Sequence, residues 1–147
     1  MPKRKDPPVR PTLDEFLAGC HAACDFLVRE FAFVRMDTPR EYNPFSVRYR
    51  KGELGVDVYG ESWGESASCE LVRGSDSLYL GLLIPRSQRK KPDRKAARPG
   101  QLEQIQEIAA FLKRHAVDYL TGDCARFDTA LAEWRRITRH REPSEAQ

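Results

Sequence analysis

The sequence predicts an α+β domain with an N-terminal helix, a four-stranded antiparallel meander, and two C-terminal helices packed on one face of the sheet. Apolar residues recur at steps of three and four over residues 13–32 and again beyond Gly100, which is the period of amphipathic helices. Between these segments the period changes to two, as in half-buried strands. The turns between the strands are shorter than the roughly dozen residues of a parallel crossover, so the strands are expected to be antiparallel.

The first helix is expected over residues 13–32. Thr12 and Glu15 form a capping-box pattern at its start, in which each side chain accepts a hydrogen bond from the other residue's backbone. A second apolar stripe follows Gly100 and ends at Thr121-Gly122, where glycine can stop a helix. The last helix is expected over residues 123–139.

Four strands are expected, at residues 45–50, 54–59, 67–73 and 78–84. The last of them, with the sequence LYLGLLI, is apolar on both faces and is therefore expected to lie in the centre of the sheet. Residues 62–65 form the turn of the second hairpin, between the second and third strands.

Composition predicts one domain with basic flanks. The expected parts are a disordered, basic, proline-rich tail at 1–11, a single domain at 12–140 with a basic linker at 86–98, and a disordered tail at 141–147. The net charge is +3, of which the first tail carries +3 and the linker +6, so the rest of the chain carries −6. The net charge is positive, but the chain thus consists of an acidic body with two basic segments.

The sequence predicts a cytoplasmic protein without a membrane span. No apolar run reaches the roughly 18 residues that a transmembrane helix needs, and no apolar segment follows the basic start as in a signal peptide. The four cysteines lie in apolar periodic segments and lack zinc-site spacing, so we expect reduced, buried thiols, no metal and no cofactor. They are Cys20, Cys24, Cys69 and Cys124.

The sequence GESWGES places one tryptophan, Trp63, at the tip of the second hairpin. A phosphate loop would contain a lysine and be followed by a helix. This stretch has neither, so a turn is the better interpretation. Its polar neighbours predict that the indole is exposed and could anchor an interface. With Asp57, Glu61 and Glu65 on the same hairpin, we expect a surface that binds a protein partner, and no catalytic residues.

Two other functions remain open. The basic linker could neutralise phosphates of a nucleic acid, which would involve Arg89, Lys90, Lys91, Arg94 and Lys95. It contains no aromatic residue for stacking on bases, so a solvated linker is the preferred interpretation. An enzyme without a recognisable motif is the third hypothesis.

The order of elements resembles that of small bacterial cytoplasmic proteins of the immunity type, which neutralise a toxin by binding it, and of other bacterial single-domain proteins without a known function. The resemblance rests on FLVREFAFV at the end of the first helix, SVRYRKGELGVDVYGE as the first hairpin, and FDTALAEWRR near the end. It covers residues 13–138 and implies a basic toxin domain as the partner, with no catalytic residues to transfer.

Overall fold

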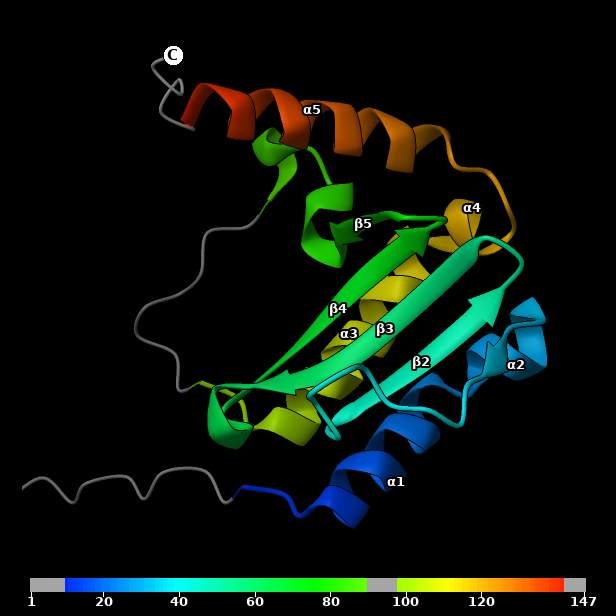
Figure 1. The fold of residues 1–147 in the computed structure, drawn as a ribbon, viewed down its shortest axis with the longest axis vertical. Helices are drawn as coiled ribbons and strands as arrows, with labels where there is room; N and C mark the ends of the chain where they lie inside the picture. The colour runs from blue at the N-terminus through cyan, green and yellow to red at the C-terminus, as the bar shows by residue number, and fades with distance from the viewer. Residues whose placement is uncertain (1–9, 90–97, 142–147) are drawn as a thin grey trace, which may run out of the picture.

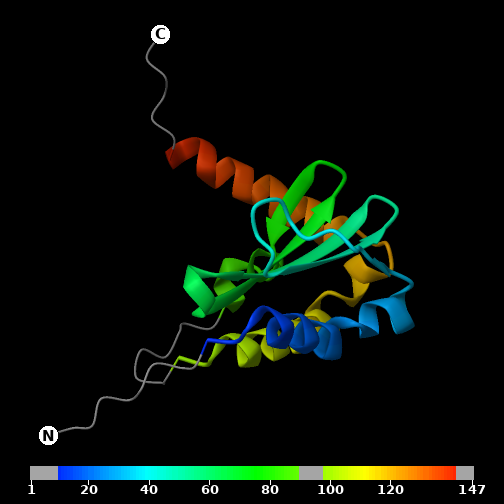
Figure 2. The same ribbon diagram turned by 60° about the horizontal axis from the view of Figure 1, so that its bottom comes forward.

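The computed structural model describes residues 10–89 and 98–141. The antiparallel sheet has five strands in chain order, β1 (Val34–Arg35), β2 (Ser46–Lys51), β3 (Leu54–Glu61), β4 (Ser66–Arg73) and β5 (Asp76–Tyr79). Figures 1 and 2 show its place in the molecule. Helices α1 (Leu13–Cys24) and α3 (Gln101–His115) cover one face of the sheet. The segment between β1 and β2 crosses the other face, on which no helix of the described residues packs (Figure 2). The predicted α+β class and meander are therefore confirmed.

The N-terminal helix begins at the predicted cap. Thr12 Oγ1 accepts from Glu15 N at 3.2 Å, and Glu15 Oε1 accepts from Thr12 N at 3.0 Å. The predicted single helix over 13–32 is, however, divided at Asp25, after which α2 (Phe26–Phe31) ends at Ala32 in the left-handed conformation. α1 packs closely on α3, since a Cβ added to Gly19 would lie 2.9 Å from Leu102 Cδ2.

Three long strands form the body of the sheet. β2 (Ser46–Lys51), β3 (Leu54–Glu61) and β4 (Ser66–Arg73) pair in register along most of their length. One face carries the apolar partners of the ladder, such as Val58 opposite Cys69, and the other face carries Asp57 opposite Glu70. Alternation along the strands thus separates a buried apolar face from a polar face, as predicted.

The two outer strands differ from the prediction. β1 (Val34–Arg35) is a short fifth strand that the sequence did not indicate. The predicted central strand at 78–84 is wrong, because β5 (Asp76–Tyr79) lies at the edge and the chain then turns into the 3₁₀ segment η2 (Leu80–Leu83). The stretch is apolar throughout because the 3₁₀ turn buries Leu80 and Leu83 and therefore needs apolar residues there.

The C-terminal half also contains one helix more than predicted. The second predicted helix ends at His115, and α4 (Val117–Leu120) follows after Ala116. The last helix, α5 (Ala125–Arg141), packs against β5 and η2 at the end of the sheet, beyond β5 in Figure 1. Of the two predicted helices, only α3 therefore covers the face of the sheet.

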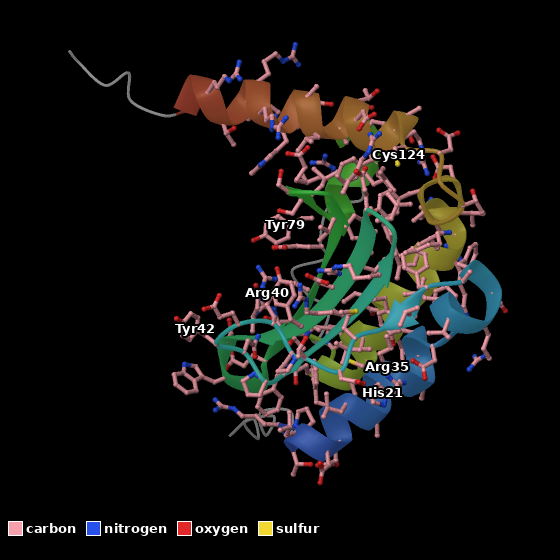
Figure 3. All side chains as sticks on the ribbon, turned by 45° about the vertical axis from the view of Figure 1, so that its right-hand side comes forward. His21, Arg35, Arg40, Tyr42, Tyr79 and Cys124 are labelled. Atoms are coloured by element: carbon pink, nitrogen blue, oxygen red, sulfur yellow. The ribbon has the colours of Figure 1, made fainter. Side chains whose placement is uncertain are left out.

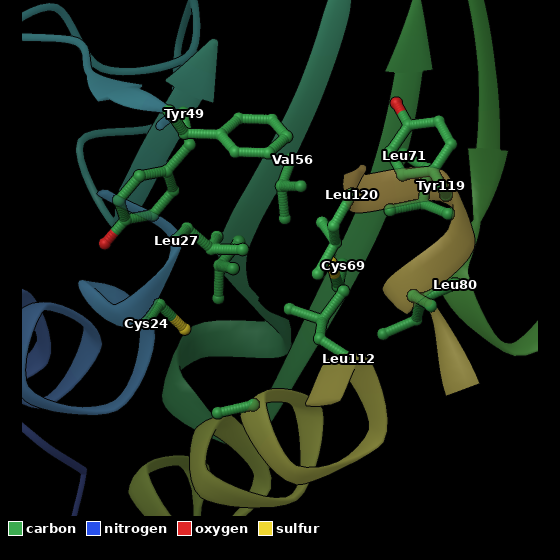
Figure 4. Packing of buried hydrophobic residues seen from close by; sticks show 14 of the residues in the cluster. Cys24, Leu27, Tyr49, Val56, Cys69, Leu71, Leu80, Leu112, Tyr119 and Leu120 are labelled. Atoms are coloured by element: carbon green, nitrogen blue, oxygen red, sulfur yellow. The ribbon is translucent and has the colours of Figure 1, made fainter. Parts of the chain in front are cut away.

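The core lies between the sheet and helices α1 and α3 (Figure 4). Cys20, Cys24 and Cys69 are buried in it, Cys124 is half-buried, and all four are free thiols, as predicted. Burial raises the pKa of Cys24 to about 12, so its thiol stays protonated at neutral pH. No helix in the described part of the chain has the length and apolar character to cross a membrane.

Tyr119 joins α4 to the sheet through its buried hydroxyl. The hydroxyl accepts from Gly55 N at 3.3 Å and lies within donating distance of the carbonyl oxygens of Gly55 and Val72. These backbone groups belong to the Gly55–Val72 pair of β3 and β4, of which Gly55 is buried and Val72 half-buried. The hydroxyl is therefore expected to contribute to stability more than an exposed phenol does.

Replacing Tyr119 by Phe should lower the free energy of unfolding by about 0.5–1.5 kcal/mol, because the backbone groups of Gly55 and Val72 would lose the hydrogen bonds of the hydroxyl. Urea denaturation followed by circular dichroism measures this loss. Tyr42→Phe is the control, since Tyr42 is 96% exposed and its hydroxyl is hydrated. Equal stabilities of the two variants would show that the buried hydroxyl contributes nothing.

Candidate aromatic interface at the hairpin tip

The turn between β3 and β4 has a left-handed backbone. Ser62, Trp63 and Gly64, which form the 3₁₀ segment η1 (Ser62–Gly64), have φ values of 54°, 61° and 91°. Glu65 N donates to Ser62 O at 3.3 Å and closes the turn. The left-handed conformation costs an L-residue about 1–2 kcal/mol, and Ser62 and Trp63 both carry this cost. Strain of this kind persists only where the surrounding structure imposes it.

Trp63 is 86% exposed, so the predicted exposure of the indole is confirmed. Tyr42, from the segment between β1 and β2, is 96% exposed and also has a positive φ, of 64°. Figure 3 shows Tyr42 projecting away from the body of the molecule. Tyr42 was not among the residues predicted from the sequence, although its place beside an Asn-Pro pair marks a loop.

Asn43 fixes the loop that carries Tyr42. Its Nδ2 donates to Gly60 O at 3.0 Å, and its Oδ1 accepts from Phe45 N at 3.0 Å. The first bond attaches the loop to the end of β3, directly before the strained turn, and the second closes a local turn within the loop. Tyr42 and Trp63 are thus held at the same corner of the sheet.

A surface hollow of about 520 Å³ lies at this corner. Both exposed aromatic residues line it. The others that line it are Arg10, Pro11, Asn43, Pro44, Phe45, Gly60, Glu61, Ser62, Gly64 and Gln101. We call Tyr42, Trp63 and this hollow the aromatic corner. Its volume falls within the range of about 300–1,000 Å³ that is typical of ligand pockets.

Helix α3 supplies Gln101 to the hollow. This side chain is almost completely buried, and its Nε2 donates to Ser66 O at 2.8 Å. Its Oε1 is buried without a hydrogen-bond partner among the described residues. A Cβ added to Gly60 would lie 2.5 Å from Gln101 Nε2, so the glutamine reaches this place only beside a glycine.

A second polar group lies on the sheet face opposite the core, where Figure 3 labels Arg40 and Tyr79. Arg50 Nη1 is 2.5 Å from Asp57 Oδ1, and Arg48 Nε is 3.8 Å from the same oxygen. On the neighbouring strand, Glu70 Oε1 accepts from Tyr59 at 2.9 Å, and its other oxygen lies 3.4 Å from an Arg40 nitrogen. We call these residues the ion-pair cluster: Arg40, Arg48, Arg50, Asp57, Tyr59 and Glu70.

Both carboxylates of the ion-pair cluster are engaged by arginines, while Arg40 Nη1 and Arg48 Nε are buried without a hydrogen-bond partner among the described residues. Each carboxylate already faces an arginine, and Arg40 also stacks on the ring of Tyr59, 4.3 Å from its centroid. Burial and the hydrogen bond to Glu70 raise the pKa of Tyr59, which keeps the phenol protonated. Asp57 and Glu70 are thus opposed across two strands but engaged, whereas a general base or a metal site needs a free carboxylate. No group of three potential metal ligands comes together in residues 10–89 and 98–141.

The structure separates the four predicted partner-binding residues. Glu61, Trp63 and Glu65 are exposed together at the hairpin tip. Asp57 does lie on the face opposite the core, but it is only 6% exposed, so it differs from the expected surface carboxylate. The cause is Arg50, whose guanidinium lies directly over it. Alternation indicated the correct face but could not indicate that an arginine of β2 covers it.

The alternative nucleic-acid residues lie mostly beyond the described part of the chain. Lys90, Lys91, Arg94 and Lys95 are outside the described residues. Arg89 is exposed, and its Nε donates to Ile84 O at 2.9 Å. The nucleic-acid hypothesis therefore stays a prediction.

The chain matches no protein-family model, no curated protein and no solved structure. Its function is therefore argued from its own residues and their arrangement.

Replacing Asp57 by Asn should lower the free energy of unfolding by about 1–2 kcal/mol, because the half-buried guanidinium of Arg50 would lose its counter-charge. Chemical denaturation measures this. Glu61→Gln is the control: it removes one carboxylate charge from the same strand at an exposed position, and should change stability by about 0.5 kcal/mol at most. A similar small change for Asp57→Asn would contradict a structural role for the ion-pair cluster.

Proposed function

We propose that this protein is a non-enzymatic protein-binding domain and that its partner contacts the aromatic corner. The main support is the exposure of two large aromatic side chains beside one hollow: Tyr42 is 96% exposed and Trp63 is 86% exposed. Both residues have a strained, left-handed backbone. Neither side chain contributes to the core. A conformation that costs stability and exposes apolar surface is a reason to expect a binding role.

The chemistry of the aromatic corner suits a protein interface. Tyrosine and tryptophan are enriched among the residues that dominate binding energy, because each buries a large area with few rotatable bonds. The hydrogen bonds of Asn43 hold one loop, and the closed turn holds the other, so little ordering entropy remains to be lost on binding.

Charge favours a basic partner. Glu41, Glu61 and Glu65 are exposed on the two loops of the corner, and none of them takes part in an ion pair with a described residue. Acidic residues around an apolar centre accelerate association with a positively charged surface. An inhibitor of a basic toxin domain, as in the immunity-type proteins that the chain resembles, is the form of this function that we favour.

The sheet face supports binding at the corner in preference to catalysis on the sheet. The carboxylates of Asp57 and Glu70 are engaged by arginines. Every residue of the cluster except Arg40 lies on β2, β3 or β4, and none of the six has a positive φ. The strained positions of the described residues instead include three aromatic-corner residues, Tyr42, Ser62 and Trp63.

Replacing Trp63 or Tyr42 by Ala should each weaken partner binding by about 30-fold, which corresponds to about 2 kcal/mol. Stability should change by about 0.5 kcal/mol at most, because neither side chain is buried. The partner is first captured on the immobilised wild-type protein from a lysate of the source organism, and its affinity for each variant is then measured by calorimetry.

Trp134→Ala is the matched control, since Trp134 lies on α5, away from the aromatic corner, and is 37% exposed. This variant should retain the partner. The proposal is wrong if the corner variants bind as tightly as wild type, or if only Trp134→Ala loses binding.

A further inference from the structure

The aromatic corner contains one buried acceptor that no described residue of the protein engages. Gln101 Nε2 is committed to Ser66 O at 2.8 Å, which sets the orientation of the amide. Gln101 Oε1 then remains buried without a partner among the described residues. Buried polar atoms are nearly always hydrogen-bonded, so such an atom in the lining of a hollow points to a donor supplied from outside.

The other residues that line the hollow restrict which chemical group could supply that donor. Both polar atoms of the Asn43 side chain already make hydrogen bonds. Its Nδ2 donates to Gly60 O, and its Oδ1 accepts from Phe45 N. The walls are formed by aromatic rings and by prolines. A ligand that fits must therefore combine an apolar stem with a polar donor at its end.

The charges at the rim favour a cation. Glu61 lines the hollow, and its carboxylate accepts one hydrogen bond, from Ser68 Oγ at 2.9 Å, which leaves further acceptor capacity. Glu41 and Glu65 are exposed beside it, against a single cation in the lining, Arg10. An exposed indole also attracts a cation over its face.

From these contacts we infer that the aromatic corner takes an arginine side chain of the partner protein, an inference that rests on the proposed function. The guanidinium plane stacks on the Trp63 indole and its stem packs on the apolar wall. Gln101 Oε1 is covered in the free protein, so the lining shifts on binding until this oxygen accepts from the guanidinium. Arginine fits better than lysine because its planar group can stack and donate in several directions at once. An arginine stem already packs at this rim, since a Cβ added to Gly64 would lie 3.1 Å from Arg10 Cγ.

The test uses three capped tripeptides, Gly-Arg-Gly, Gly-Lys-Gly and Gly-citrulline-Gly, titrated into the full-length protein. Trp134→Phe leaves Trp63 as the one tryptophan of the chain, so that its fluorescence reports on the corner alone. The arginine peptide should change this fluorescence saturably. Citrulline keeps the shape but not the charge and should bind about tenfold more weakly. The lysine peptide should bind more weakly than the arginine peptide.

Gln101→Leu, made in the same background, removes the free acceptor and should weaken the arginine peptide by about tenfold. Gln104→Leu is the matched control: Gln104 also ties α3 to the hairpin, through Ala67 N at 2.9 Å and Glu65 O at 2.9 Å, but does not line the hollow. It should change peptide binding by less than about twofold. Should Gln101→Leu not fold, Glu61→Gln, at an exposed position, should weaken the same peptide by at least about threefold.

Equal binding of the arginine and citrulline peptides, or no saturable binding of either, overturns the inference. So does equal weakening by Gln101→Leu and Gln104→Leu. These results leave the proposed function standing if Trp63→Ala still loses the natural partner. The proposed function fails separately, when the natural partner binds Trp63→Ala and Tyr42→Ala unchanged.

Discussion

Two glutamines of helix α3 hold the return strand of the long hairpin, and the geometry of the aromatic corner depends on the one that lines it, Gln101. β5 pairs with β4 only from Glu70 to Arg73, so the beginning of β4 has no strand on its outer side. Gln101 and Gln104 bond its backbone there, at Ser66 O and Ala67 N. These side chains take the place of a neighbouring strand and also protect an otherwise free sheet edge.

The same attachment explains why the turn is strained and why its tryptophan is exposed. With Ser66 fixed to the helix and Gly60 fixed to Asn43, few residues remain to reverse the chain, and they do so in left-handed conformations. A Cβ of left-handed Trp63 then points outward, where no core is available. The amide nitrogen of Gln101 donates to the strand, and its buried oxygen has no partner among the described residues, so one side chain serves both the fold and the proposed site.

The sequence indicated the fold class because each long element has a clean period, but it could not indicate what packing decides. LYLGLLI at 78–84 is apolar throughout, and periodicity alone cannot distinguish a central strand from a buried 3₁₀ turn. Within the site, the polar neighbours of Trp63 were enough to predict its exposure. Tyr42 and Gln101 were not predictable, because their roles come from contacts between segments far apart in the chain. Asp57 was placed on the correct face, but its burial depends on Arg50 of another strand.

The central claim is that the strained turn is kept for binding at a cost in stability, and Trp63→Gly tests it most directly. Glycine relieves the left-handed strain, so the free energy of unfolding should stay equal or rise by up to about 1 kcal/mol, while partner affinity falls by at least about 30-fold. Gly74→Ala calibrates the strain: φ is +61° there and a Cβ would meet nothing within 4 Å. A clear loss of stability in Trp63→Gly with partner binding retained would contradict the account.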